Sequence, residues 1–340
     1  MKKILVTGGS GFIGTNFINF LGKKKFKIAN LDKISKISTP EIFKIQSKNY
    51  IFFKLNMLNK KKLEKTIFKF RPDVIVNFAA ESHVDRSIDN PDQFLINNFI
   101  SATNLFDVFK KFSKSKKNSK LIHISTDEVF GSNNSKPSKE NSLYKPSSPY
   151  SSSKASTDLV AFSFNKTYKT KIQIVNLCNC YGPYQYLEKF IPTCIFSIIK
   201  NKPLPLYGKG KNIREWMHVE DACRAIFKIA LSKNKSFRFN IGSDLRYKNT
   251  YIAKKIFQII KTKNLTKLTE KNYYKFVKDR PGHDLRYALN SSLFKKTFGF
   301  KTNFKLDNGL QNTINWYLNN NMWSSYILKK FTRKRLGLNG

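Results

Sequence analysis

The stretch Thr7-Gly8-Gly9-Ser10-Gly11-Phe12-Ile13-Gly14 decides the fold. It follows an apolar run, residues 2–7, and opens an amphipathic run, residues 12–21, so we expect a strand, a tight loop and a helix. Glycines at positions 8, 11 and 14 allow a sharp turn, close approach of the backbone to a pyrophosphate, and close packing of the helix on the strand. The phosphates would lie against free amides at the N-terminus of the helix.

Further apolar runs continue this pattern along the first half of the chain. We expect strands at residues 27–32, 50–55, 73–79, 120–126 and 171–177, separated by helical segments. Asp32 ends the second strand, 18 residues after Gly14, where a carboxylate accepts hydrogen bonds from an adenosine ribose. It would repel a 2′-phosphate and so favours NAD over NADP, although the neighbouring Lys33 weakens that argument. Six strands of this kind predict an α/β fold with a doubly wound, Rossmann-type parallel sheet.

The second half of the chain is less regular. Beyond Tyr181 the sequence becomes richer in Pro, Gly and Trp, as in 202–205 (KPLP) and 279–283 (DRPGH). We expect a smaller, mixed C-terminal domain that binds the substrate. The expected boundaries are 1–180 for the NAD-binding domain, with later segments returning to it, 181–330 for the substrate domain, and 331–340 for a basic tail.

Composition excludes some classes of protein and leaves one alternative open. The 340 residues are 40% hydrophobic and 14% aromatic, which indicates a globular protein. The 63 Lys and Arg against 22 Asp and Glu give a net charge of +41. This charge is typical of a nucleic-acid binder or of lysines scattered over solvated faces; we favour scattered lysines because they form no single block and accompany no nucleic-acid-binding motif.

The apolar runs, the cysteines and the histidines indicate the location of the protein and its metal content. No apolar run reaches the roughly 20 residues of a membrane helix, and the chain starts directly with a strand, so we expect a cytoplasmic protein without a leader or membrane contact. The four cysteines lack the spacing of a zinc site and the four histidines are dispersed. We therefore expect free thiols and no metal.

Tyr150 and Lys154 are the first candidate catalytic pair. Their i, i+4 spacing places both on one face of a helix that follows a Pro- and Ser-rich loop. We expect the ammonium to lower the pKa of the phenol from about 10 toward neutrality, so that Tyr150 can take a proton from a sugar hydroxyl. After a dinucleotide-binding loop, this spacing is typical of a short-chain dehydrogenase.

Thr126-Asp127-Glu128 is the second candidate catalytic group. It lies at the end of the fifth expected strand, at the edge of the sheet where ligands bind. A hydroxyl at Thr126 suffices to complete a dehydrogenase triad. The two adjacent carboxyls add acid–base chemistry at a neighbouring carbon, unless they belong to a solvated loop.

The chain resembles the extended short-chain dehydrogenase/reductase family, and within it the dTDP-glucose 4,6-dehydratases. The resemblance covers nearly the whole chain. It rests on 79–87 (AAESHVDRS), 123–131 (HISTDEVFG), 181–185 (YGPYQ), 202–208 (KPLPLYG), 214–216 (REW) and 279–284 (DRPGHD).

This resemblance implies an activity. Tyr150 would deprotonate the C4 hydroxyl of dTDP-glucose while NAD oxidises C4. Glu128 would then remove the C5 proton and Asp127 would protonate the leaving C6 hydroxyl. The C6 hydroxyl would leave as water, and reduction at C6 would then give dTDP-4-keto-6-deoxyglucose. This product would feed deoxysugar biosynthesis, such as that of rhamnose. The family also implies a homodimer.

The resemblance also implies binding residues. Around NAD it places Gly8, Gly11, Phe12, Ile13, Gly14, Asp32, Lys33, Asn56, Met57, Ala79, Ala80, Ser82, Asn97, Tyr150, Lys154 and Cys180. Around the nucleotide-sugar it places Ser82, His83, Thr126, Asn179, Lys189, Phe190, Pro205, Tyr207, Arg214, Asn249, Arg280 and His283. The guanidinium forks of Arg214 and Arg280 suit a diphosphate, although an arginine on its own is as often a surface residue. Asn56, Asn97 and Cys180 depart from the family pattern, where aspartate, threonine and asparagine are usual.

Three alternatives remain open from the sequence. A UDP- or CDP-glucose 4,6-dehydratase would share every motif. A nucleotide-sugar 4-epimerase or a UDP-glucuronate decarboxylase would share the glycine loop and the Tyr150–Lys154 pair but does not need Asp127 and Glu128. A non-catalytic NAD-sensing or RNA-binding module is suggested by the charge alone.

Overall fold

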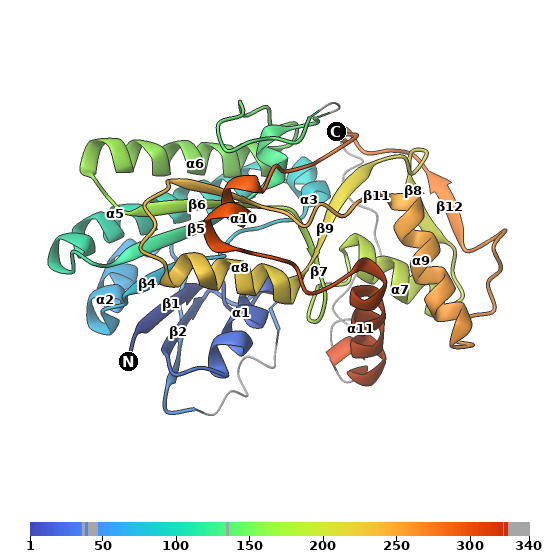
Figure 1. Ribbon diagram of the computed structural model, residues 1–340, viewed down its shortest axis with the longest axis horizontal. Coiled ribbons are helices and arrows are strands. Elements are labelled where there is room, and N and C mark those ends of the chain that lie inside the picture. Colours follow the sequence, from blue (N-terminus) through green and yellow to red (C-terminus); the bar gives the residue numbers. More distant parts are fainter. Residues whose placement is uncertain (36–37, 40–46, 134–135, 322, 326–340) are drawn as a thin grey trace.

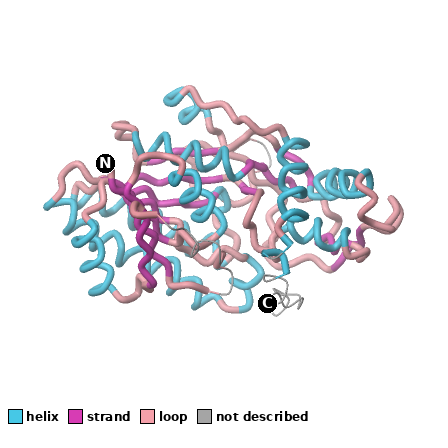
Figure 2. Tube along the Cα trace, turned by 90° about the horizontal axis from the view of Figure 1, so that it is seen from below, coloured by secondary structure: helices cyan, strands magenta, loops and turns pink. Residues whose placement is uncertain are grey.

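A computed structural model describes residues 1–35, 38–39, 47–133, 136–321 and 323–325. The expected basic tail, 331–340, lies outside these residues. The described part forms a three-layer α/β sandwich joined to a smaller lobe (Figure 1). In the perpendicular view of Figure 2, the strands run between helices on either side.

Seven parallel strands build the large sheet, in the order β10-β6-β5-β4-β1-β2-β3. The strand order reverses direction between β1 and β4, as in doubly wound nucleotide-binding folds. The fold predicted from the sequence is therefore confirmed. The strands are β1 (Lys3–Thr7), β2 (Lys27–Asp32), β3 (Tyr50–Lys54), β4 (Val74–Asn77), β5 (Lys120–Thr126), β6 (Ile172–Leu177) and β10 (Arg238–Ile241).

The seventh strand, β10, was not expected from the sequence. It is four residues long, comes 60 positions after β6, and pairs in parallel with β6, for example Phe239 with Val175. A strand this short carries too few alternations to stand out from the irregular sequence around it.

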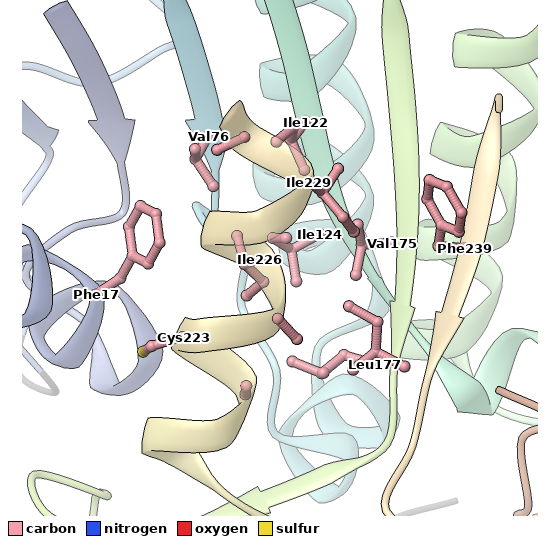
Figure 3. Close-up of a cluster of buried hydrophobic side chains, with 14 of the residues drawn as sticks. Phe17, Val76, Ile122, Ile124, Val175, Leu177, Cys223, Ile226, Ile229 and Phe239 are labelled. Carbon is pink, nitrogen blue, oxygen red and sulfur yellow. The ribbon is translucent and has the colours of Figure 1, made fainter. Parts of the chain in front are cut away.

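Successive apolar side chains of each strand point to opposite faces of the sheet, so helices cover both faces. In β1, Ile4 and Val6 belong to one buried cluster and Leu5 to the other. Helices α1 (Phe12–Gly22) and α8 (Val219–Leu231) cover the first face, and α2 (Lys60–Phe70), α5 (Ser101–Ser115) and α6 (Pro149–Tyr168) the second. Figure 3 shows Ile226 and Ile229 of α8 directed at Ile122, Ile124 and Val175 of the sheet.

Short helices and a π-helix connect β4 to α5. They are α3 (Val84–Asp89), α4 (Pro91–Phe94) and the π-helix Leu95–Ile100. A 3₁₀-helix, Asp127–Phe130, follows β5 directly. Both non-α segments carry residues predicted for the site, which is a common use of such geometry.

The smaller lobe contains two further small sheets and its own core. One sheet has the order β11-β9-β7 and the other pairs β12 with β8. Tyr181, Trp216, Ile256 and Leu310 are buried in this core. Its elements are β7 (Asn179–Tyr181), α7 (Phe190–Ile199), β8 (Leu204–Tyr207), β9 (Ile213–His218), β11 (Arg246–Lys248), α9 (Asn249–Thr262), β12 (Tyr274–Val277) and α11 (Leu306–Asn319). Helix α10 (Ser292–Phe298) packs instead against β10 of the large sheet.

No helix in the described part of the chain combines the length and the apolar character that a membrane crossing requires. The four cysteines are free and buried.

Candidate active site

The glycine loop between β1 and α1 is shaped by positions that exclude a side chain. Gly8 has φ +68°, and a Cβ there would lie 2.6 Å from the Cα of Ala79. A Cβ on Gly14 would lie 2.3 Å from the carbonyl oxygen of Gly8. Gly11 is the N-cap of α1 and provides no side-chain cap, so the N–H groups of the first turn remain available to an anion. The loop therefore fits the pyrophosphate of a dinucleotide.

A pocket of about 630 Å³ lies beside this loop, at the ends of β2 and β4. Asp32 accepts hydrogen bonds from the backbone N–H groups of Ser10, at 3.0 Å, and Ile34, at 2.8 Å, which fix its carboxylate at the pocket. Lys33 forms an ion pair with Glu81 at 3.0 Å and also donates to Asn97 at 3.0 Å. Glu81 therefore balances the charge of Lys33 beside Asp32. Of the residues predicted to bind NAD, this pocket is lined by Gly8, Gly11, Asp32, Lys33, Asn56, Met57, Ala79, Ala80 and Asn97.

A larger cleft, with about 2110 Å³ of empty space, runs from the glycine loop into the smaller lobe. Its lining comes from both lobes, so residues more than 100 positions apart meet across it. The predicted site residues in its wall are Gly8, Gly11, Phe12, Ile13, Gly14, Ala80, Ser82, His83, Thr126, Glu128, Tyr150, Lys154, Asn179, Cys180, Lys189, Phe190, Pro205, Tyr207, Arg214, Asn249, Arg280 and His283. Asp127 is the predicted residue that lines neither pocket; it is buried directly behind Thr126, whose hydroxyl lies 3.2 Å from Oδ1 of Asp127.

Helix α6 places Tyr150 and Lys154 in this cleft. Its start is fixed by Pro149 at the first helical position and by a reciprocal capping box, in which the side chains of Ser148 and Ser151 each accept the other's backbone N–H. Tyr150 therefore sits in the first turn, and Lys154 follows one turn later on the same face, as the spacing predicts.

The expected effect of Lys154 on Tyr150 is wrong for this structure. Burial raises the pKa of Tyr150, and the nearby carboxylates of Glu128 and Asp127 raise it further, against a hydrogen bond with Thr126. The ammonium of Lys154 instead donates to the carbonyl oxygen of Ile124 at 2.7 Å and lies 3.1 Å from Nε2 of His123. Tyr150 is thus a protonated phenol here; a cation near its hydroxyl would lower this pKa, because it favours the ionised form.

Asp127 and Glu128 occupy a buried 3₁₀-turn rather than a solvated loop. Burial raises the pKa of Asp127 well above its usual value, and the charges of Glu128 and Glu215 add to this. Burial also raises the pKa of Glu128, but Arg280, Arg214 and Lys189 oppose that rise. The pKa values of these two adjacent carboxyls are therefore driven apart, which suits Asp127 to donate a proton and Glu128 to accept one. Among the described residues, neither Oδ2 of Asp127 nor Oε2 of Glu128 has a hydrogen-bond partner.

Two arginines form the cationic wall of the cleft, and neither is a surface residue. Arg214 is buried, its guanidinium stacks 4.2 Å from the ring centre of Tyr287, and it donates to the carbonyl oxygen of Asp284 at 3.0 Å. Arg280 forms an ion pair with Asp85 at 2.8 Å. Fixed guanidinium groups facing a cleft suit a diphosphate.

Several residues of the site were not predicted from the sequence. Asp85 holds Arg280 and also accepts a hydrogen bond from Tyr207 at 2.7 Å, yet the sequence shows it only as one member of the 79–87 motif. Tyr287 lines the cleft and has no local signal. Asn98 accepts from the N–H of Glu81 at 2.7 Å and donates to the hydroxyl of Ser153 at 2.9 Å. These three are defined by contacts across the fold, which no local pattern records.

Comparisons with known proteins agree along nearly the whole chain. The family model described as GDP-mannose 4,6 dehydratase matches residues 5–313. The dTDP-glucose 4,6-dehydratase of Haemophilus influenzae is 36% identical, over 94% of this chain and 99% of that protein.

Solved structures agree as well. A crystal structure of dTDP-glucose 4,6-dehydratase from Bacillus anthracis in complex with NAD is 35% identical, with a TM-score of 0.86 over 96% of this chain and 100% of that one. The corresponding enzyme of Streptomyces venezuelae, crystallised with NAD, is 32% identical, with a TM-score of 0.87 over 94% of this chain and 98% of the other.

Proposed function

We propose that this chain, which belongs to the GDP-mannose 4,6-dehydratase family, is an NAD-dependent dTDP-glucose 4,6-dehydratase. The observation that carries this reaction is the pair of carboxyls beside Thr126: burial raises the pKa of Asp127, whereas three nearby cations oppose the rise in the pKa of Glu128. An epimerase or a decarboxylase has no need for such a pair. Bound NAD supplies the redox chemistry, oxidising C4 of the sugar first and reducing C6 last, so there is no net oxidation.

Each proton transfer is assigned to one residue of the chain. Tyr150 takes the proton of the C4 hydroxyl, which Thr126 helps to orient. The new ketone acidifies C5, and Glu128 takes the C5 proton. Asp127 gives its proton to the departing C6 hydroxyl, which leaves as water. As C6 is reduced, Glu128 gives a proton back to C5, and the proton that Tyr150 took from the C4 hydroxyl replaces the one that Asp127 lost.

We also assign binding roles by lobe. Residues 1–180, with later segments that return to the large sheet, hold NAD through the glycine loop and Asp32, whose surroundings fit a dinucleotide. Residues 181–330 supply Arg214 and Arg280 for the diphosphate of the nucleotide-sugar. We propose that the enzyme acts in the cytoplasm and that its lysine excess is spread over the surface rather than gathered in a nucleic-acid interface.

The substrate is tested by incubating the protein with dTDP-, UDP- and CDP-glucose in parallel. We expect a 4-keto-6-deoxy product from dTDP-glucose, with kcat/KM at least about 10-fold above that for UDP-glucose, because a buried methyl group on the base is worth roughly that factor. Product formation is followed by mass spectrometry as loss of one water. Equal rates with all three substrates would contradict the choice of base, and an epimerised product would contradict the reaction.

We propose a homodimer, supported by apolar side chains on two neighbouring segments. Leu95, Ile96 and Ile100 of the π-helix and Leu159 and Phe162 of α6 are between 42% and 58% exposed, and the two segments pack together. The double substitution Leu159→Glu with Phe162→Glu is expected to convert the dimer into a monomer in sedimentation, because it buries two charges. Leu143→Glu, at an exposed leucine of the loop before α6, is the matched control; a dimer that survives the double substitution excludes this face.

A further inference from the structure

A buried polar cluster lies behind Lys154, and the proposed reaction gives it no role. Its members are His123 of β5 and Asp158 of α6, whose side chains are 1% and 0% exposed, and Asn77 of β4. An uncompensated charge in such a place is strongly unfavourable, so each member must have a defined partner or protonation state.

Asn77 fixes the tautomer of His123. Its Oδ1 accepts the hydroxyl of Thr7 at 2.5 Å and the backbone N–H of Ala79 at 3.2 Å, so that atom must be the amide oxygen. The amide nitrogen therefore donates to Nδ1 of His123, at 2.9 Å. His123 is thus neutral and carries its proton on Nε2.

That N–H points toward Asp158 and Lys154. Oδ2 of Asp158 accepts from the hydroxyls of Ser125, at 2.7 Å, and Tyr144, at 2.8 Å. Oδ1 of Asp158 has no hydrogen-bond partner in the described part of the chain, and it lies 3.7 Å from Nε2 of His123. Nε2 of His123 is also 3.1 Å from Nζ of Lys154, but a protonated nitrogen cannot accept a hydrogen bond from an ammonium. The neutral histidine therefore cannot stabilise the positive charge of Lys154.

We propose that Asp158 is a positioning residue for Lys154: its carboxylate, which accepts hydrogen bonds from Ser125 and Tyr144, favours the positively charged form of Lys154 one turn away on α6. This inference rests on the proposed function, because it concerns the charge of a residue that belongs to the proposed catalytic pair. The spacing supports it, since positions 154 and 158 share one face of α6, one turn apart. Burial lowers the pKa of Lys154 to about 8, and Asp158 opposes that fall. Burial likewise raises the pKa of Asp158, and Lys154, Ser125 and Tyr144 oppose that rise, so each group favours the ionised form of the other.

The other charged groups around α6 do not replace Asp158. Glu128 and Asp127 of the 3₁₀-helix act on Tyr150, and Arg238 of β10 stacks on Tyr144 at 4.8 Å. Strand β6 and the π-helix carry no titratable side chain. Charged groups of α3, α4 and α5 are paired elsewhere or lie at the surface: Asp85 with Arg280, Arg86 with Glu188, Asp107 with Lys60 and Lys110, Lys111 with Glu64, and Asp89, Asp92 and Lys114.

The first test is the pH profile of kcat for the full chain, its Asp158→Asn variant and a matched control. Without the carboxylate, Lys154 loses its proton at lower pH, so the alkaline limb of the profile moves down by about one pH unit. Asp221→Asn removes another buried carboxylate, one that pairs with Arg224 on α8, and is expected to leave the limb in place. A limb that stays at the wild-type pH in Asp158→Asn overturns the proposal, even if kcat falls.

The second test does not depend on activity. The pKa of Lys154 is lower in the folded protein than in the unfolded chain, so its contribution to the free energy of unfolding is present at high pH and lost as pH falls through about 8. In Asp158→Asn this loss is expected about one pH unit lower, measured by urea unfolding at a series of pH values. An unchanged midpoint overturns the inference. Failure of the wild-type protein to convert dTDP-glucose would instead reject the proposed function.

Tyr144→Phe provides a second variant if Asp158→Asn does not fold. It removes one hydrogen bond to Oδ2 of Asp158 while keeping the ring on which Arg238 stacks. Because this bond favours the ionised carboxylate, its loss is expected to move the same alkaline limb down by a smaller amount. A shift to higher pH would contradict the proposal.

Discussion

The substitution Glu128→Gln is expected to reduce kcat by about 10³-fold while leaving the first oxidation intact. The amide keeps the shape of the side chain but cannot take the C5 proton, so the reaction halts at the 4-keto stage with the cofactor reduced. In a single turnover, the absorbance of reduced nicotinamide should therefore build up and persist, whereas in the wild-type protein it stays transient.

The control for this substitution is Glu64→Gln. Glu64 is a glutamate of α2 whose contact is a surface ion pair with Lys111, and we expect wild-type turnover. Glu128 is not the base at C5 if Glu128→Gln eliminates water at the normal rate, or if the substitution slows the first oxidation as much as the elimination.

Tyr150→Phe is expected to lower kcat by roughly 10³-fold or more by abolishing the first step. No reduced nicotinamide should appear in a single turnover, which distinguishes this variant from Glu128→Gln. The ring remains in place against Phe94, with 6.4 Å between the two ring centres, so the urea midpoint of unfolding should stay close to that of the wild-type protein. Turnover and unfolding are measured on the same preparation.

The control here is Tyr168→Phe, a half-exposed tyrosine at the other end of α6. It should behave like the wild-type protein. Retention of activity in Tyr150→Phe would show that Tyr150 is not the base of the first oxidation.

Much of the large sheet could be predicted because its signals are local. The apolar runs of β1 to β6 and the glycines at 8, 11 and 14 are visible within a few residues, and the structure places each strand within two residues of its expected ends. Backbone atoms of Phe78 and Ala79, just after β4, leave no room for a side chain at Gly8, and those of the loop itself leave none at Gly14; the spacing of the glycines predicted both positions.

The rest of the site depends on distant contacts. Arg280 is held by Asp85, which is 195 positions away, and Asn98 joins the loop after β4 to helix α6. The resemblance to a family supplied Arg280 but no reason for its orientation. The pKa of Tyr150 was mispredicted for a similar reason, because spacing along a helix does not reveal burial or the carboxylates of another segment.

The central claim is loss of water across C5 and C6 through proton removal by Glu128. Its most direct test is turnover of dTDP-glucose by the wild-type protein in deuterated water, with the product examined by NMR. We expect a 4-keto-6-deoxy product that carries solvent deuterium at C5. A 4-keto-6-deoxy product that retains the original hydrogen at C5 would contradict it.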